Sequence, residues 1–288
     1  MTAATRGKTM ELEGKTAIVT GGGRGIGEGI AHVLAREGAN VVVMGRHAAE
    51  VECVSHSIET SGGIALPIVA DVTDWASLQA LTAKAVDRFG GVDILVNNAG
   101  IEGPARLLED LPVEQWDDVL GINLKGVFLC SKAVLPAMFA RGGGRIINIS
   151  SIAGRRMTFF GSVDYTVSKY GVEGLTQHLA WELADRRITV NSVCPGGVVT
   201  PLMEESITVA YRELVTKRLV PLGRMCTMEE IGETVSFLAS DRASMITGQS
   251  LAVDGGTLSG WGEDLRTVVR KRMADAKADE ARRTKHAI

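Results

Sequence analysis

The sequence predicts one α/β domain built on a doubly wound, parallel sheet of seven strands. Seven short runs rich in Val and Ile recur along the 288 residues, and the segments between them mostly have helical spacing of apolar residues. The runs are continuous rather than alternating, as expected for parallel strands covered by helices on both faces. Such a sheet has right-handed crossovers and a ligand crevice at the carboxyl ends of its strands. The expected strands are Lys15–Thr20, Asn40–Met44, Ala65–Ala70, Val92–Val96, Arg145–Ser150, Ile188–Val193 and Ser250–Val253.

The first strand leads into a segment with the period of an amphipathic helix. Ile26, Ile30, Val33 and Leu34 recur on one helical face, and Gly38 stands where a helix C-terminus favours a residue with positive φ. The next expected strand follows at once. These segments predict a βαβ unit, and its repetition predicts the doubly wound sheet.

Length and composition favour a single domain. A chain of 288 residues with 45% hydrophobic content can bury a sizeable core within one α/β unit. We expect a flexible N-terminal extension over residues 1–11, the domain over 12–256, and a partly helical C-terminal extension over 257–288.

Charge and cysteine usage exclude several classes of partner. The formal net charge is −3, with no basic stripe suited to a phosphate backbone, so nucleic acid is an unexpected partner. The four cysteines form no paired spacing and the five histidines do not cluster, which favours reduced thiols over a disulfide or metal framework. Met1–Met10 lacks a signal-peptide core, and no stretch has the ~18 apolar residues of a membrane span. The sequence therefore predicts a soluble cytoplasmic protein with no metal and no membrane partner.

A glycine-rich turn, Thr20–Gly27, lies between the first expected strand and helix. Its glycines permit a tight turn and let a pyrophosphate approach the helix N-terminus, where free N–H groups and the helix dipole favour an anion. The spacing is Gly-x-x-x-Gly-x-Gly rather than the commoner Gly-x-Gly-x-x-Gly. A purely structural tight turn is the alternative, so the turn alone does not establish a dinucleotide site.

Further motifs follow in order. Asn97–Gly100 follows the fourth expected strand, Ser151 follows the fifth, and Tyr165–Lys169 supplies a Tyr-x-x-x-Lys pattern. With these motifs the chain resembles the short-chain dehydrogenase/reductase family in its compact, single-domain form, and is similar to its 3-oxoacyl-carrier-protein reductase-like members. The resemblance covers roughly Leu12–Gly256 and implies a Rossmann-type fold that binds NAD or NADP.

The resemblance also implies positions that contact the cofactor. Asp71 and Val72 resemble the pair that meets the adenine ring, and the segment after Pro195 resembles the part that meets the nicotinamide. Asp254, with two glycines after it, resembles the end of the family's last strand. The complete set of expected cofactor-binding residues is Gly21, Arg24, Gly25, Ile26, Gly27, Arg46, Asp71, Val72, Asn98, Ala99, Gly100, Tyr165, Lys169, Pro195, Gly196, Val198 and Thr200.

Tyr165, Lys169 and Ser151 have the side chains needed for proton transfer. A free tyrosine ionises near pH ~10, but Lys169 lies at i+4, on the same helical face, where its ammonium would favour the phenolate. Together with an oxidised nicotinamide, this charge would bring Tyr165 toward working pH as the general acid/base. Ser151 would hydrogen-bond the substrate oxygen. These residues predict hydride transfer between a nicotinamide cofactor and a secondary alcohol or ketone carbon.

Each catalytic assignment has a structural alternative. Tyr-x-x-x-Lys occurs by chance in many helices, and the adjacent Ser150 is interpreted as structural. The resemblance implies that Lys169 also holds the nicotinamide ribose and that Asn123 supports a water relay. Asparagine is equally suited to capping a helix end, and Asn97 and Asn98 are equally suited to a turn.

The substrate-binding residues are less defined. The gap between Ser151 and Tyr165 is one residue longer than the commonest family spacing, and the loop Gly154–Phe160 absorbs it. This loop, Ile101 with Glu102, and the segment Leu202–Leu219 border the expected substrate position. Arg155 and Arg156 in the loop have the chemistry to receive a carboxylate, phosphate or coenzyme A group, although solvation or pairing with acids is the stronger interpretation. The sequence does not name the substrate.

Cofactor choice depends on the end of the second strand. An NAD enzyme usually has Asp or Glu there, whereas this strand ends Val43–Arg46, with Arg46 in place of the acid. Arg24 in the glycine turn is a second candidate for contact with a 2′-phosphate. The alternatives are that Arg24 merely suits the turn and that Arg46 stacks on adenine. We expect NADP, with NAD as the alternative.

A different class of function stays open: a catalytically idle protein that binds the cofactor as a sensor or scaffold. Such a protein has no physical need to retain Ser151, Tyr165, Lys169 and Asn123 together, so these residues favour the enzyme.

The resemblance also implies a homotetramer. Beyond the matched region an apolar helical stripe predicts a docked segment, with Trp261 near a substrate entrance, although a frayed, solvated tail fits equally well. The stripe comprises Leu265, Val268, Val269, Met273 and Ala276.

Overall fold

The computed structural model describes residues 10–158, 161–200, 208–260, 271, 273 and 274. They form one doubly wound α/β domain whose seven-stranded sheet has the order β3-β2-β1-β4-β5-β6-β7, with every neighbouring pair parallel. The predicted fold class and the seven strands are confirmed. The strands are β1 (Thr16–Thr20), β2 (Asn40–Gly45), β3 (Ile64–Val69), β4 (Ile94–Asn97), β5 (Gly144–Ile149), β6 (Ile188–Pro195) and β7 (Ser250–Val253).

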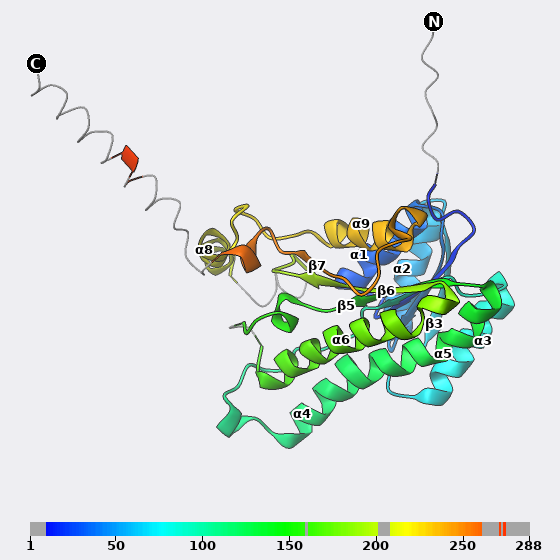
Figure 1. Cartoon of the computed structure of the whole chain (residues 1–288), viewed down its shortest axis with the longest axis horizontal. Coiled ribbons are helices and arrows are strands. Elements are labelled where there is room, and N and C mark those ends of the chain that lie inside the picture. Colours follow the sequence, from blue (N-terminus) through cyan, green and yellow to red (C-terminus); the bar gives the residue numbers. More distant parts are fainter. Residues whose placement is uncertain (1–9, 159–160, 201–207, 261–270, 272, 275–288) are drawn as a thin grey trace, which may run out of the picture.

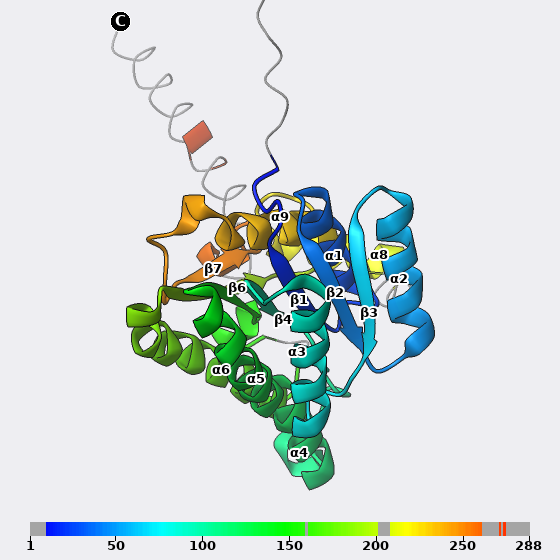
Figure 2. The same ribbon diagram turned by 90° about the vertical axis from the view of Figure 1, so that its right-hand side faces the viewer.

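Helices cover both faces of the sheet, as Figures 1 and 2 show. Helices α1, α2 and α9 lie over one face, and α3, α5 and α6 lie over the other. The helices are α1 (Gly25–Arg36), α2 (Ala48–Thr60), α3 (Trp75–Phe89), α4 (Val113–Leu120), α5 (Gly126–Arg141), α6 (Val163–Glu182), α8 (Val209–Leu219) and α9 (Met228–Ala239).

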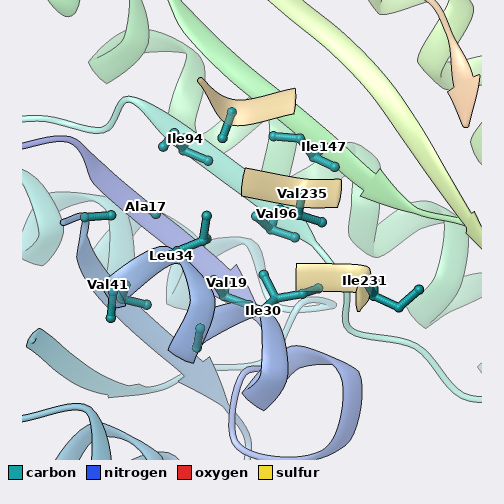
Figure 3. Close-up of a cluster of buried hydrophobic side chains, with 14 of the residues drawn as sticks. Ala17, Val19, Ile30, Leu34, Val41, Ile94, Val96, Ile147, Ile231 and Val235 are labelled. Carbon is teal, nitrogen blue, oxygen red and sulfur yellow. The ribbon is translucent and has the colours of Figure 1, made fainter. Parts of the chain in front are cut away.

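Alternation along each strand divides the interior into two apolar cores. On β1, Ala17 and Val19 face the core under α1 and α9, whereas Ile18 faces the core on the other side of the sheet. Figure 3 shows Val19 beside Ile30 of α1, and Val96 of β4 beside Val235 of α9. Because both faces of each strand are buried, the strands have continuous apolar sequences rather than alternating ones.

The first βαβ unit has the predicted form. Helix α1 ends at Arg36, and Gly38 takes a φ of 93°, in the left-handed region that glycine tolerates without steric cost. Strand β6 continues two residues beyond its predicted end because Cys194 and Pro195 pair with Ala252 and Val253 of β7.

One helical run, Val113–Arg141, is long and apolar enough to cross a membrane by length and composition. It comprises α4, a π-helical turn over Gly121–Lys125 and α5. Half of its most apolar window is buried, and the run packs against α3 and α6, so it is a core helix of the domain. The π-helical turn determines where Asn123 lies.

The carboxyl ends of all seven strands meet at one edge of the sheet. The strand order reverses between β1 and β4, which is where open α/β sheets bind their ligands. Of the predicted C-terminal extension, residues 257–260, 271, 273 and 274 are described, and Met273 is an exposed helical residue. The other stripe residues and Trp261 lie outside the described residues.

Candidate active site

The glycine turn brings the N-terminus of α1 close to the end of β1. Gly21 and Gly25 have positive φ angles of 63° and 56°, which glycine adopts freely. A Cβ on Gly27 would lie 2.1 Å from the carbonyl oxygen of Gly21, so only glycine permits this packing of helix against turn.

The same helix terminus has the chemistry of an anion site. The N-cap residue of α1, Arg24, makes no side-chain hydrogen bond to the first turn. The N–H groups of that turn are therefore open to another acceptor, and together with the helix dipole they suit a pyrophosphate. The turn fits a dinucleotide cofactor, as its sequence predicts.

Asn98 holds the glycine turn against the end of β4. Its side-chain amide donates to the carbonyl oxygens of Thr20 and Gly21 at 3.0 and 3.1 Å. The main-chain N–H groups of Asn98 and Ala99 both donate to Thr20 Oγ1 at 3.0 Å. Asn98 therefore connects the two motifs at the reversal point, beyond forming a turn. Asn97 is the last residue of β4.

The segment after β6 reaches the glycine turn from the other side. A Cβ on Gly25 would lie 3.9 Å from Thr200 Cγ2. Val198 forms an isolated β-bridge with Cys226 and is buried, which fixes this segment. The structure thus brings together three sequence-distant groups of expected cofactor-binding residues.

The expected adenine-side residues differ in how they are held. Asp71 Oδ1 accepts hydrogen bonds from the main-chain N–H and the hydroxyl of Thr73, both at 2.8 Å, so it closes the turn after β3. Val72 is buried and sits against Gly126, where a Cβ would lie 2.8 Å from Val72 Cγ2. Arg46 is exposed directly after β2.

Arg24 has an acidic neighbour that sequence spacing did not identify. Its Nη1 lies 3.8 Å from Glu50 Oε1 of α2, and the Arg24 side chain is 70% exposed. This neighbour partly offsets the charge of Arg24 in the region expected to contact the adenosine ribose.

Ser151 and α6 bring the expected proton-transfer groups together. The Ser151 hydroxyl lies near enough to the Tyr165 phenol to lower its pKa. Lys169 Nζ lies 5.6 Å from the Tyr165 ring centroid and donates to the Ile149 carbonyl oxygen at 2.9 Å. A Cβ on Gly161 would lie 2.8 Å from Tyr165 Cδ1, so glycine gives the ring its room. The i, i+4 placement of Tyr165 and Lys169 is the one their spacing predicts.

The chain's own residues do not lower the pKa of Tyr165. Burial raises that pKa to about 12, the Ser151 hydroxyl opposes the change, and the charge of Glu102 adds to it. Burial also lowers the pKa of Lys169 to about 8. Lys169 is not among the groups that shift the pKa of Tyr165, so in the chain by itself burial determines the direction of the change.

Asn123 holds the loop after β4 rather than capping a helix. Its Oδ1 accepts from the Ile101 N–H, and its Nδ2 donates to the Ile101 carbonyl oxygen, each at 2.8 Å. Nδ2 also donates to Ser168 Oγ at 3.2 Å. Because Asn123 lies inside the π-helical turn, between α4 and α5, the capping alternative does not apply.

The residues expected around the substrate occupy different settings. Arg155 Nη1 donates to the Ser250 carbonyl oxygen at 3.3 Å, and Arg156 Nη1 donates to the Gly260 carbonyl oxygen at 3.1 Å. Part of the Glu102 side chain is open to solvent, yet surrounding protein raises the pKa of its carboxyl, while Lys169 opposes that change. Phe159, Phe160 and residues 202–207 lie outside the described residues.

Three polar residues of α6 belong to this region although sequence analysis did not single them out. Asp164 is fully buried and its Oδ1 accepts from the Tyr165 N–H at 2.8 Å. Ser168 donates to the Tyr165 carbonyl oxygen at 2.7 Å. Glu173 is buried one turn beyond Lys169. The spacing of Glu173, four residues after Lys169, was the available signal.

Known proteins share this fold over most of the chain. A family model described as Enoyl-(Acyl carrier protein) reductase matches residues 21–257. A 3-oxoacyl-[acyl-carrier-protein] reductase FabG of Thermotoga maritima is 40% identical over 247 residues, which cover 86% of this chain and 99% of that protein.

Solved structures of similar proteins have the same fold as this chain. A short-chain type dehydrogenase/reductase from Mycobacterium marinum superposes with a TM-score of 0.82 at 36% identity, covering 88% of this chain and 98% of the other. A 7α-hydroxysteroid dehydrogenase complexed with NADH and 7-oxo glycochenodeoxycholic acid gives a TM-score of 0.81 at 34% identity, covering 86% and 96%.

A doubly wound sheet with a glycine turn at its reversal point defines a dinucleotide-binding oxidoreductase fold. Within that class, the chain belongs to the short-chain dehydrogenase/reductase family, whose members use nicotinamide cofactors. The resemblance inferred from the motifs is confirmed.

Proposed function

We propose that this chain is an NADP-dependent alcohol dehydrogenase or ketone reductase, with Tyr165 as its general acid/base. The observation that carries the proposal is the grouping of Tyr165 with Ser151, which lowers its pKa, and with Lys169, whose Nζ lies 5.6 Å from the tyrosine ring centroid one turn further along α6. This group lies at the carboxyl edge of the sheet, on the same edge as the glycine turn.

Each of the four proposed catalytic residues has a separate role in the reaction. Ser151 orients the substrate oxygen, and Tyr165 gives a proton to that oxygen in reduction or takes one from it in oxidation. Lys169 supplies positive charge beside the phenol and holds the nicotinamide ribose, and Asn123 supports a water relay. The cofactor, when bound, supplies or accepts the hydride.

For Tyr165 to act as a base, its phenol needs a further positive charge nearby, which an oxidised nicotinamide would supply when bound. A phenol with a pKa of about 12 is a poor base at neutral pH. A cation near the phenol favours its ionised form, so the acid/base function of Tyr165 is expected to depend on the loaded cofactor.

For the cofactor, we favour NADP because an exposed arginine, Arg46, follows β2 where an NAD enzyme usually has an acid. Arg24 adds less than its sequence position suggests, since Glu50 lies 3.8 Å away. NAD is the alternative, and the structurally similar 7α-hydroxysteroid dehydrogenase was solved with NADH.

A substrate panel tests the function directly. The chain is mixed with NADPH or NADH and a panel of ketones, 3-oxoacyl thioesters and sugars, and nicotinamide absorbance is followed; alcohols with oxidised cofactor test the reverse direction. Turnover of at least one carbonyl compound is expected. Cofactor binding without turnover in either direction would instead support the idle sensor or scaffold.

We also propose a cytoplasmic homotetramer. All four cysteines are free thiols, as a reducing compartment requires. Large apolar side chains on α5 and α6 are exposed in the single chain, which favours burial against another copy. They are Phe128, Phe139, Val163, Val167, Tyr170 and Trp181.

Light scattering tests the assembly. A mass near four chains is expected, and Trp181→Glu together with Phe128→Glu should reduce it by placing charge in the contact. A monomeric mass for the unaltered chain at micromolar concentration would contradict the proposal.

A further inference from the structure

Glu173 is a buried carboxylate that the proposed mechanism does not use. Its Oε2 accepts a hydrogen bond from Ser192 Oγ at 2.8 Å, and its Oε1 accepts one from Cys194 Sγ at 3.3 Å. Cys194 Sγ lies 3.2 Å from Ser250 Oγ of β7. Both carboxylate oxygens are therefore fixed by neighbouring side chains of β6, and rotation of the Glu173 side chain is restricted.

Glu173 continues the line of catalytic groups along α6. Tyr165, Lys169 and Glu173 are spaced at i, i+4 and i+8, which places them on one face of the helix. Lys169 is buried, with 6% exposure. Its ammonium donates a hydrogen bond to the Ile149 carbonyl oxygen rather than to a carboxylate. The charge of Lys169 thus depends on more distant groups.

Because Lys169 is buried, its side chain is only partly protonated near physiological pH. Burial lowers the pKa of Lys169 to about 8, while the ionised forms of Cys194, Glu173 and Glu102 raise it. A pKa close to physiological pH means that a modest change in the surrounding charge alters the protonated fraction substantially.

The three neighbouring groups do not act equally at neutral pH. Burial raises the pKa of Cys194 to about 11, so its thiol is neutral there. Glu102, on the loop after β4, also raises the pKa of Tyr165, which opposes phenolate formation. Glu173 is not among the groups that perturb Tyr165. Of the three groups, Glu173 alone is ionised at neutral pH and raises the pKa of Lys169 without also raising that of Tyr165.

We propose that Glu173, held by Ser192 and Cys194, is a positioning residue that keeps the Lys169 ammonium protonated. The role deepens the proposed oxidoreductase function and depends on it for its catalytic meaning. Its electrostatic part, the charge state of Lys169, is a property of the folded chain and is measurable without turnover.

NMR of the chain labelled with 13C at lysine Cε measures that charge state, with the Lys169 signal assigned by its loss in Lys169→Arg. The unaltered chain should titrate with a midpoint near 8. Glu173→Gln keeps the size of the side chain but removes its charge, so its midpoint should be lower by roughly one pH unit. Glu173→Met should lower it too, which keeps the test valid if the glutamine variant fails to fold.

Three further variants separate charge from packing. Ser192→Ala removes the 2.8 Å hydrogen bond but keeps the carboxylate, so it should lower Tm with little change in the midpoint. Glu173→Asp keeps the negative charge, so the midpoint of its Lys169 titration should lie close to that of the unaltered chain. Glu182→Gln removes a charge from the exposed end of the same helix and should change nothing.

Activity gives the second measurement. The alkaline limb of the kcat/KM profile of Glu173→Gln should move to lower pH by the same amount, and the two profiles should converge toward pH 6, where Lys169 is protonated in both. An unmoved NMR midpoint, or an equal loss of activity at every pH, would overturn the positioning role. A shifted midpoint in a chain that reduces no carbonyl compound would instead contradict the proposed oxidoreductase function and leave the electrostatic role intact.

Discussion

The proposed site at the carboxyl edge of the sheet has two halves that are built differently. In the proposed catalytic half, Lys169 is 6% exposed and Tyr165 is partly buried, and burial moves the pKa of each. In the proposed adenine half, Arg24 is 70% exposed and Arg46 is exposed, so solvent screens their charges. Where burial controls charge, one substitution should have a large effect; where solvent screens it, the effect should be small.

Tyr165→Phe should have the largest effect. It removes the one hydroxyl assigned to proton transfer, and general acid/base catalysis contributes roughly 10²–10⁴-fold. We expect kcat to fall by about a thousandfold while the dissociation constant of NADPH changes little. Steady-state kinetics and fluorescence titration of the cofactor measure the two quantities. Comparable turnover in the variant would end the case for Tyr165.

Lys169→Met should separate activity from stability. Loss of the ammonium removes the charge beside Tyr165 and the proposed ribose contact, so both kcat and cofactor affinity should fall. A buried ammonium also costs stability, and its removal should raise the free energy of unfolding at pH 7 by roughly 1–3 kcal/mol.

The pH dependence of that gain follows from the lowered pKa of Lys169. Between about 8 and 10.5 the folded chain has lost the proton and the unfolded chain still carries it, so the unaltered chain becomes more stable as pH rises. The advantage of Lys169→Met should therefore shrink from pH 7 to pH 10 in urea denaturation. A constant advantage would show that packing, not charge, accounts for it.

Sequence reasoning was strongest where a pattern repeats or a spacing is geometric. Continuous apolar strands predicted the sheet, and the four-residue spacing of Tyr165 and Lys169 predicted a shared helical face. Spacing gave no information about the effect of burial. The pKa of Tyr165 moves upward because its neighbours desolvate it, and no spacing rule reports that balance.

Sequence reasoning also could not predict contacts between segments that are far apart in the chain. Asn123 binds both main-chain groups of Ile101 because a π-helical turn interrupts the run from α4 to α5, and the sequence has no simple signal for that turn. Glu50 lies beside Arg24 only after α2 folds back against the glycine turn.

In the adenine half, Arg46→Ala should have an intermediate effect. A charge-assisted hydrogen bond contributes about 1.5–3 kcal/mol, so loss of a contact with the 2′-phosphate should reduce the preference for NADPH over NADH by roughly tenfold or more. The ratio of kcat/KM values for the two cofactors measures this, and kcat should stay nearly constant. An equal or greater preference of the unaltered chain for NADH would contradict the NADP assignment and leave the hydride chemistry untouched.

The smallest effect is expected from Glu50→Gln, which tests the screening argument itself. Glu50 offsets the charge of Arg24 at 3.8 Å, and exposed pairs of this kind contribute about 0.2–1 kcal/mol. Removing the carboxylate should raise the NADPH preference by no more than about fivefold at low salt. Because the pair is exposed, the gain should nearly vanish at 0.5 M NaCl, where the screening length is only a few ångströms. The matched substitution in the buried half, Glu173→Gln, should keep its effect on Lys169 at the same salt concentration. Equal salt sensitivity of the two variants would show that burial is not what distinguishes the two halves.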